Sequence, residues 1–356
     1  MFNLIITINK GRKMNTLRKM AYSILASAFV FANANAGELS VTGSAKATYT
    51  ILSTGSSTAG AGDSAGKGIG IANEFTLGAS GELDNGFTWS MNQDIDGATV
   101  QDDKSIVIGM GGLGSVKINV SDGGLQKNFS SSQSVYGTPV DNGEGGTYTD
   151  SADTGTMNSF RYTTPSGLPL DISASVQYAP GTGQNDVASS NSGGTIDASG
   201  YDSATEYAVS LSPIEGLEVG ASYFNPEDDN GTSQEAEGGA YYATYSMGAF
   251  SLGYGKSYMA ASLNPADSDS TEAHDNTQMS VAFNVNDALS VSYEDIESEQ
   301  QNQTSTSDVT MDVQSIQATY TVAGVTLAVS TEDYDNHDYT AGAEMTETNF
   351  AMTIAF

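Results

Sequence analysis

The stretch Thr346–Phe356, TETNFAMTIAF, ends the chain on alternating polar and apolar residues. Phe350, Met352, Ile354 and Phe356 fall on one face of a β-strand, because the side chains of a strand point to opposite faces with a period of two. A chain that ends in such a strand leaves an unpaired edge, which is an aggregation risk unless another strand covers it. Pairing with the first strand of the same chain closes a barrel and removes that edge.

The N-terminal region has the pattern of an export signal. A basic start at Arg18 and Lys19 precedes the apolar run AYSILASAFVFA, residues 21–32, and Ala34-Asn35-Ala36 has the small residues of a cleavage site. The apolar run is too short to span a bilayer as a helix. We therefore expect a signal peptide over residues 1–36, a translation start at Met14 and one exported domain over residues 37–356.

The composition limits the chemistry that is available. The chain has no cysteine, which excludes a disulfide framework and thiolate chemistry. Twelve basic residues stand against 43 acidic residues, the formal net charge is -31, and five of the basic residues lie in the leader. Such a chain repels nucleic acid and anionic phosphates at long range. The acidity fits a solvated surface, or loops that collect divalent cations.

Runs with a period of two, bounded by Gly, Pro, Asn and Asp, recur along the whole domain, and no amphipathic helix stands out. They predict sixteen strands, at residues 38–51, 69–83, 87–95, 104–110, 114–121, 157–163, 170–180, 203–212, 216–224, 239–247, 249–258, 276–285, 288–297, 311–321, 324–334 and 346–356. Short links alternate with long polar links, so both termini lie on the short-turn side. This order predicts an all-β fold, a 16-stranded antiparallel transmembrane β-barrel with short periplasmic turns and long external loops.

The two faces of the strands agree with a barrel in a membrane. One face is apolar, as at Trp89 and Met91, and the opposite face is polar, as at Ser90 and Asn92. Apolar residues outward and polar residues inward require hydrocarbon outside and water within. Tyrosines near strand ends are expected at the membrane interface, where a ring with a polar tip is stable: Tyr49, Tyr178, Tyr223, Tyr254, Tyr293, Tyr320 and Tyr334.

The export signal, the sixteen strands, the terminal Phe356 and the segment Asn158–Pro165, NSFRYTTP, together resemble the general (non-specific diffusion) porins of Gram-negative bacteria, in the proteobacterial type. The resemblance covers the whole mature chain, which has fewer basic residues than the usual pattern of that family. It implies an outer-membrane location, a homotrimer surrounded by outer-membrane lipid, and a third external loop folded into the lumen as a constriction. By this resemblance residues 123–156, after the fifth strand, form the constriction loop.

The charges at the narrowest point of a water-filled barrel select the solutes that pass. In the family that this chain resembles, acidic residues of the third loop face basic residues of the wall. The loop region offers Asp122, Asp141, Glu144, Asp150 and Asp153, and alternation turns Lys46, Lys117 and Arg161 toward the lumen. Arg161 either contributes to the field across the pore or pairs with a loop carboxylate and holds the loop in place. With so few bases we expect cation preference, or weak selectivity if the external acids lie far from the constriction.

Other candidate sites are weaker. Oxygen-rich loop segments offer Asp228, Asp229, Asp267 and Asp269 as calcium ligands, but none has the full spacing of a twelve-residue calcium loop. Solvated loops account for these residues without a metal, so a structural calcium ion is the only cofactor left open. No serine or acid has a base at the spacing of a hydrolase triad, and we therefore expect no catalytic residue and no enzyme activity.

The sequence predicts an outer-membrane porin for passive diffusion of small hydrophilic solutes and ions, without a nucleic-acid partner. One alternative is a secreted acidic β-rich surface protein or adhesin that binds calcium, which internal repeats would favour; no fixed period is found. The other is a substrate-selective porin, which needs a ladder of aromatic or basic residues along the lumen. The inward set is mainly Ser, Thr, Asn and Ala, and this favours general diffusion.

Overall fold

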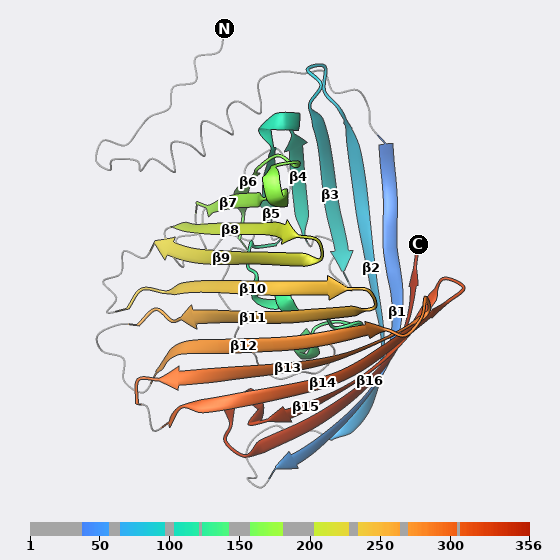
Figure 1. The fold of residues 1–356 in the computed structure, drawn as a ribbon, viewed down its shortest axis with the longest axis vertical. Coiled ribbons are helices and arrows are strands. Elements are labelled where there is room, and N and C mark those ends of the chain that lie inside the picture. The colour runs from blue at the N-terminus through green and yellow to red at the C-terminus, as the bar shows by residue number, and fades with distance from the viewer. Residues whose placement is uncertain are drawn as a thin grey trace.

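The computed structural model describes residues 38–56, 65–96, 103–120, 123–141, 157–180, 203–227, 234–263, 270–304 and 307–356. Within these ranges sixteen antiparallel strands form one closed barrel (Figure 1). The strands are β1 Glu38–Ser56, β2 Gly66–Glu82, β3 Thr88–Asp96, β4 Lys104–Gly109, β5 Ser115–Val120, β6 Ser159–Thr163, β7 Ser173–Ala179, β8 Ser203–Ile214, β9 Leu217–Glu227, β10 Glu237–Met247, β11 Phe250–Ala260, β12 Thr271–Asn284, β13 Leu289–Asn302, β14 Val309–Val322, β15 Val325–Asp335 and β16 Ala343–Ala355. The predicted fold class is confirmed. Among the described residues, no helix has the length and apolarity needed to cross a membrane.

The barrel closes where the first and last strands meet. β1 pairs antiparallel with β16, and the two lie side by side in Figure 1 as the blue and red ends of the chain. Phe356 completes the ladder, because its N–H donates to the Gly43 carbonyl at 3.0 Å and its carbonyl accepts from the Gly43 N–H at 2.9 Å. The Phe356 ring also packs on Phe75 of β2, with ring centroids 5.6 Å apart. The edge that the terminal sequence exposes is therefore covered by this chain's own first strand.

The short turns gather at the rim where β16 ends. In the turn between β2 and β3, the Leu83 N–H donates to the Phe87 carbonyl at 2.7 Å and the Phe87 N–H donates to Asn85 Oδ1 at 3.0 Å. Gly86 in this turn has φ +81°, a conformation that side chains other than glycine rarely adopt. The sequence Asp-Asn-Gly therefore sets a tight turn that leaves both strands in register.

The outer face is apolar and the inner face is polar, as alternation predicts. On β14, Ile316 on the outer face is 66% exposed, whereas its neighbours Ser315 and Gln317 on the inner face are buried. One prediction is wrong: Tyr334 lies on the inner face, 1% exposed, and not at the membrane interface. Its hydroxyl donates to the Pro139 carbonyl at 3.2 Å, inside the barrel. Its place near a strand end predicts the membrane interface, but the alternation along β15 decides which face the side chain occupies.

Several strands continue beyond their predicted external ends. β13 runs to Asn302 instead of residue 297, and β12 begins at Thr271 instead of residue 276. Backbone hydrogen bonds continue there, since Glu297 still pairs with Asp312 and Glu299 with Thr310. The apolar alternation stops earlier because the outer face turns acidic at these positions. The sequence pattern therefore marks the apolar band of the wall, and the paired backbone extends past it.

Candidate pore lining

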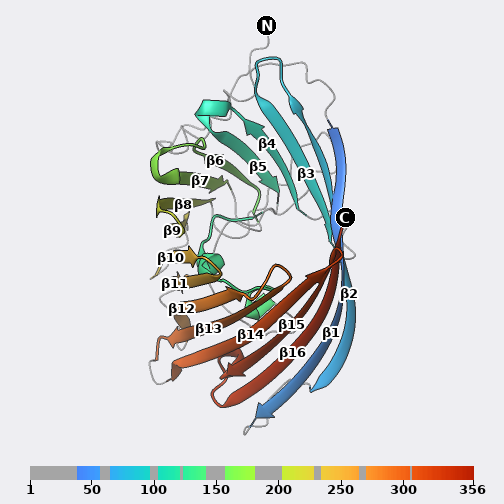
Figure 2. The same ribbon diagram turned by 45° about the vertical axis from the view of Figure 1, so that its right-hand side comes forward.

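The segment 123–141, between β5 and β6, crosses the inside of the barrel (Figure 2). It contains two short 3-10 turns, η2 Asn128–Ser131 and η3 Pro139–Asp141. Its polar contacts reach inner-face residues of β6, β7, β9, β12, β13, β14 and β15 in turn. We call this segment the luminal loop, and the inner faces of β9–β15 beneath it the covered wall. It is the described part of the predicted constriction loop.

Arg161 on β6 holds the start of the luminal loop. Its Nη2 donates to the carbonyls of Gly123 at 2.6 Å and Gly124 at 3.0 Å, and its Nε donates to Gln177 Oε1 at 2.5 Å. Gln177 on β7 also donates from Nε2 to the Gly123 carbonyl, at 3.2 Å. Hydrogen bonds from a charged donor are stronger than those between neutral groups. The guanidinium therefore fixes the direction in which the loop enters the lumen, through backbone carbonyls.

Two glycines on β11 let the middle of the luminal loop lie flat on the wall. A Cβ built on Gly253 would stand 1.7 Å from the Ser131 carbonyl oxygen, and one on Gly255 would stand 2.5 Å from Ser131 Oγ. The Ser131 carbonyl accepts from Ser280 Oγ at 2.7 Å, and the Gln133 N–H donates to the same hydroxyl at 3.0 Å. The missing side chains of β11 thus make the space that the loop backbone fills.

Glu294 on β13 is the central acceptor for the luminal loop. Its Oε2 accepts hydrogen bonds from Ser132 Oγ at 2.7 Å and from Ser134 Oγ, and its Oε1 accepts from Gln278 Nε2 on β12. The residue is 1% exposed. A buried carboxylate costs much free energy unless it is well hydrogen-bonded. The three donors meet that requirement and tie the loop to the wall at the same time.

The far end of the described loop is fixed through its backbone. The Val135 N–H donates to Ser292 Oγ at 3.0 Å, and the Tyr136 N–H donates to Gln317 Oε1 at 2.9 Å. Gln317 also donates from Nε2 to the Gly137 carbonyl at 2.8 Å. One glutamine side chain therefore satisfies an N–H and a carbonyl of the stretch between η2 and η3, which lies outside both 3-10 turns.

Lys46 on β1 meets the luminal loop from another part of the wall. Its Nζ lies 4.6 Å from the centroid of the Tyr136 ring, in a cation–π contact. The contact directs the ammonium of Lys46 at the loop. Two of the three predicted wall bases therefore touch the described loop, Arg161 at its start, Gly123, and Lys46 at Tyr136 in its second half.

Lys117, the third predicted base, lies on β5 directly opposite Arg161 in the strand register. The side chain of Lys117 is half-buried. Like charges directly opposite each other on neighbouring strands repel. The guanidinium of Arg161 is instead turned toward the Gly123 and Gly124 carbonyls, which lowers that repulsion. These two bases form the main positive patch of the inner wall at the entry of the luminal loop.

The predicted acidic partners fall mostly outside the described residues. Asp122, Glu144, Asp150 and Asp153 lie outside them, and of Asp141 the backbone alone is described, at the end of η3. The calcium candidates Asp228, Asp229, Asp267 and Asp269 also lie outside them. Within the described ranges, no group of three or more His, Asp or Glu side chains is arranged to hold a metal ion.

The inner wall carries further carboxylates that sequence reasoning missed. Glu332 on β15 and Glu347 on β16 face each other in register. Glu206 on β8 lies opposite Gln177 on β7. All three are 1% exposed. Alternation would have found Glu206, next to the outward Tyr207, and Glu347, two residues before Asn349. Glu332 lies between Thr331 and Asp333, so a polar residue on each side hides which face it occupies.

The structure is similar to solved porin structures. It resembles an anion-selective porin from Comamonas acidovorans with a TM-score of 0.65 at 12% identity, covering 90% of this chain and 100% of that chain. It resembles OmpF of Salmonella typhi, solved with daunomycin, with a TM-score of 0.60 at 13% identity. The match covers 90% of this chain and 98% of OmpF. A mutant porin of Rh. blastica aligns with a TM-score of 0.56 at 15% identity, and the match covers 90% of this chain and 100% of that porin. At these identities the likeness shows the fold alone.

Sequence comparison gives the family. No curated protein matches the chain. The sequence profile of the Gram-negative porins matches residues 21–339, which is most of the chain. The resemblance drawn from the export signal, the sixteen strands, the terminal Phe356 and the segment Asn158–Pro165 is confirmed as a family assignment, and with it the outer-membrane location. The chain belongs to the Gram-negative porin family, whose members are channel proteins of the outer membrane.

Proposed function

We propose that the protein is a passive diffusion channel for small hydrophilic solutes and ions, that residues 123–156 form its constriction, and that it prefers cations. The observation that carries the proposal is the hydrogen bonding of the luminal loop along the inner wall from Arg161 to Tyr334. A loop held flat on one side of a water-filled barrel narrows the passage and leaves the opposite side open. Solutes then pass by size and by the charge that they meet at this point.

The charges of the inner wall support the cation preference. Acidic residues outnumber basic ones on the inner faces of the described strands, even without Glu294, whose carboxylate is bound by the luminal loop and Gln278. The acidic residues are Glu74, Glu82, Asp94, Glu206, Glu218, Glu332 and Glu347, and the basic residues are Lys46, Lys117 and Arg161. Two of these bases are directed at the luminal loop. The fold alone does not decide selectivity, since one protein with the same fold is an anion-selective porin.

Planar bilayers test both parts of the proposal. The purified mature protein is inserted, single-channel steps are recorded, and the reversal potential is measured under a potassium chloride gradient. We expect ohmic steps and a reversal potential that favours potassium. Folded and inserted protein without steps would contradict the diffusion channel, and a potential that favours chloride would contradict the cation preference.

We further propose that three copies assemble through the outer faces of the terminal strands. Leu39 on β1 and Ile69 and Ile71 on β2 are exposed large apolar residues, at 76%, 84% and 79%. Such residues are suited to a partner subunit as well as to lipid. Conductance steps in groups of three, and an unheated electrophoresis band at three times the monomer mass, are the expected results. Single independent steps with a monomer band would overturn the trimer.

A further inference from the structure

Part of the inner wall is apolar, which is unexpected for a surface that faces water. Ile296, Val313, Tyr334 and Met345 are in register across β13, β14, β15 and β16, and Met311 lies beside them. They occupy the same face as Glu294 and Glu347, the inner face, and all are buried. We call these five residues the luminal apolar cluster. Apolar side chains in a water-filled lumen are stable only if another part of the chain covers them.

Two separate loops supply the cover. Phe129 and Val140 of the luminal loop pack against the luminal apolar cluster. Tyr339 completes it from η6, His337–Tyr339, in the external loop between β15 and β16, and is only 9% exposed. An external loop therefore shares one apolar contact surface with the constriction loop.

The β15–β16 loop is tied down at several points. The Tyr339 hydroxyl is hydrogen-bonded to Ser298 Oγ at 2.7 Å, and its ring lies 5.1 Å from the His274 ring. Asn336 Nδ2 donates to the Thr310 carbonyl at 2.7 Å, and Asn336 Oδ1 accepts from the Gly342 N–H at 2.8 Å. These contacts join the loop to β12, β13 and β14.

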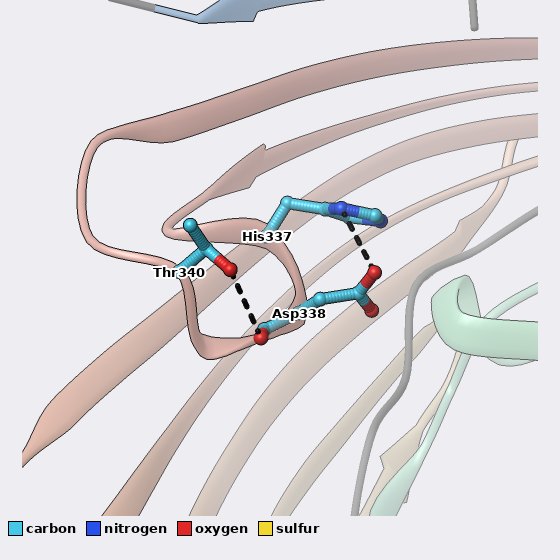
Figure 3. A network of polar contacts seen from close by, with 3 residues as sticks. All are labelled: His337, Asp338 and Thr340. Carbon is cyan, nitrogen blue, oxygen red and sulfur yellow. Dashed lines mark hydrogen bonds and ion pairs between the residues drawn. The ribbon is translucent and has the colours of Figure 1, made fainter. Parts of the chain in front are cut away.

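The backbone of this loop is held in an unfavourable conformation. Asn336, Asp338 and Tyr339 all have φ +53°, in the left-handed region that residues other than glycine rarely adopt. Figure 3 shows the local contacts inside the turn. His337 Nδ1 lies 3.5 Å from an Asp338 carboxylate oxygen, and Thr340 Oγ1 donates to the Asp338 carbonyl. Such strain persists when the surrounding contacts over-determine the conformation. The buried Tyr339 side chain is the main contact of this kind.

A line of contacts leads from the β15–β16 loop to the luminal loop. The His337 ring packs edge-on against the Tyr334 ring, with centroids 5.5 Å apart. The Tyr334 hydroxyl donates to the Pro139 carbonyl of the luminal loop at 3.2 Å. The end of the luminal loop at η3 therefore depends on Tyr334 for a hydrogen bond and on the luminal apolar cluster for packing.

We propose that Tyr339 is a positioning residue for the constriction loop: by closing the luminal apolar cluster, it keeps Phe129 and Val140 against the wall and so sets the width of the pore from the external side. The inference rests on the proposed channel function for its conductance readout. Removing the ring opens the cluster to water, and the luminal loop loses part of the surface on which it rests.

Single-channel recording of Tyr339→Ala is the first test. Loss of a buried aromatic ring should raise the ratio of undocked to docked luminal loop by at least about tenfold. The expected result is open-channel noise and additional conductance levels that wild type lacks. Tyr339→Phe keeps the ring and should restore quiet openings, and Thr340→Ala, in the same turn, is the matched control. Noise in Thr340→Ala equal to that of Tyr339→Ala would overturn the proposal, as would quiet openings in a folded Tyr339→Ala.

Thiol labelling gives a second test that does not depend on conductance. The chain has no cysteine, so Val140→Cys introduces a single reactive group at the cover of the cluster. A membrane-impermeant thiol reagent should modify it at least about tenfold faster when Tyr339→Ala is also present. An unchanged rate would contradict the positioning role. If wild type forms no channel, the diffusion function fails while this labelling rate still decides the role of Tyr339.

Discussion

The covered wall and the wall formed by β1, β2 and β3 carry the same alternation but opposite environments. Under the luminal loop the inner-face residues Ser280, Ser292 and Glu294 are buried. On β2 the inner-face residues Ala72 and Glu74 are exposed, and a Cβ added to Gly68 would meet nothing within 4 Å. We call the inner faces of β1–β3 the open wall. The same alternation therefore runs through the whole barrel, but the luminal loop covers only one side of its inner wall.

This difference separates two kinds of residue in one lumen. Residues of the covered wall hold the luminal loop, so changes to them should alter the shape and steadiness of the pore. Residues of the open wall meet the passing solute, so changes to them should alter selectivity. Lys46 of the open wall and Arg161 of β6 both contact the luminal loop, so changes to them should affect both the loop and the charge in the lumen.

The largest effect is expected from Gly253→Ala on the covered wall. The new Cβ would lie 1.7 Å from the Ser131 carbonyl oxygen, so the luminal loop or β11 must move. Overpacking of this kind costs about 1–3 kcal/mol. Single-channel recordings should show noisy openings of altered conductance. Gly68→Ala on the open wall is the matched control and should leave the openings quiet; equal behaviour of the two variants would remove the distinction between the walls.

The next effect is expected from Glu294→Ala. It leaves the hydroxyls of Ser132 and Ser134 without their acceptor. Hydrogen bonds to a charged group contribute about 1.5–3 kcal/mol each, but this loss is partly offset because the variant no longer buries a carboxylate. We expect unsteady conductance and little change in reversal potential, and Glu294→Gln should recover part of the steadiness. Glu74→Ala should do the reverse, with steady openings and weaker cation preference. Identical phenotypes in the two variants would contradict the account.

A smaller effect on the conductance properties is expected when the contact between Lys46 and Tyr136 is broken. A cation–π contact of this kind is worth about 0.5–2 kcal/mol. Tyr136→Leu releases the ammonium into the lumen and should shift the reversal potential toward chloride. Lys46→Met removes the charge and should shift it further toward potassium. Shifts of the same sign in both variants would show that the ring does not control the charge.

The smallest expected effect is a loss of the contribution of Glu74 to ion selectivity as the salt concentration rises. Screening shortens the reach of a solvated charge from ~10 Å at 0.1 M to ~3 Å at 1 M ionic strength. The contribution of Glu74 on the open wall, measured as the difference in reversal potential between wild type and Glu74→Ala, should therefore fade at high salt. A difference that stays constant from 0.1 M to 1 M would place Glu74 away from the open solvent of the lumen.

The barrel could be predicted from the sequence because the alternation of apolar and polar residues along each strand is a local pattern. Alternation along Phe350–Phe356 gives the face of the last strand, and the order of short and long links gives the topology. The inner wall follows the same rule over most of its area, including the polar residues Ser280, Ser292 and Glu294 under the luminal loop. Ile296, Val313 and Tyr334 depart from the rule because two loops distant in the sequence cover them.

The candidate site was less predictable because it depends on contacts between distant segments. Alternation predicts Arg161 as a luminal base, but the groups of the luminal loop that it binds are backbone carbonyls, which leave no signature in the sequence. Gly253 is one of forty glycines, and only its closeness to Ser131 distinguishes it. Alternation along β13 is enough to place Glu294 on the inner face, whereas its partners Ser132 and Ser134 become known only from the path of the loop.

If the luminal loop forms the narrowest part of the pore, its removal should let larger molecules enter, and polymer exclusion measures this size limit. Conductance is measured with poly(ethylene glycol) of graded size, in wild type and in a variant whose residues 128–141 are replaced by a short Gly-Ser link. Polymers that enter a pore lower its conductance. We expect larger polymers to enter the variant than enter wild type. The same size limit in both proteins would contradict it.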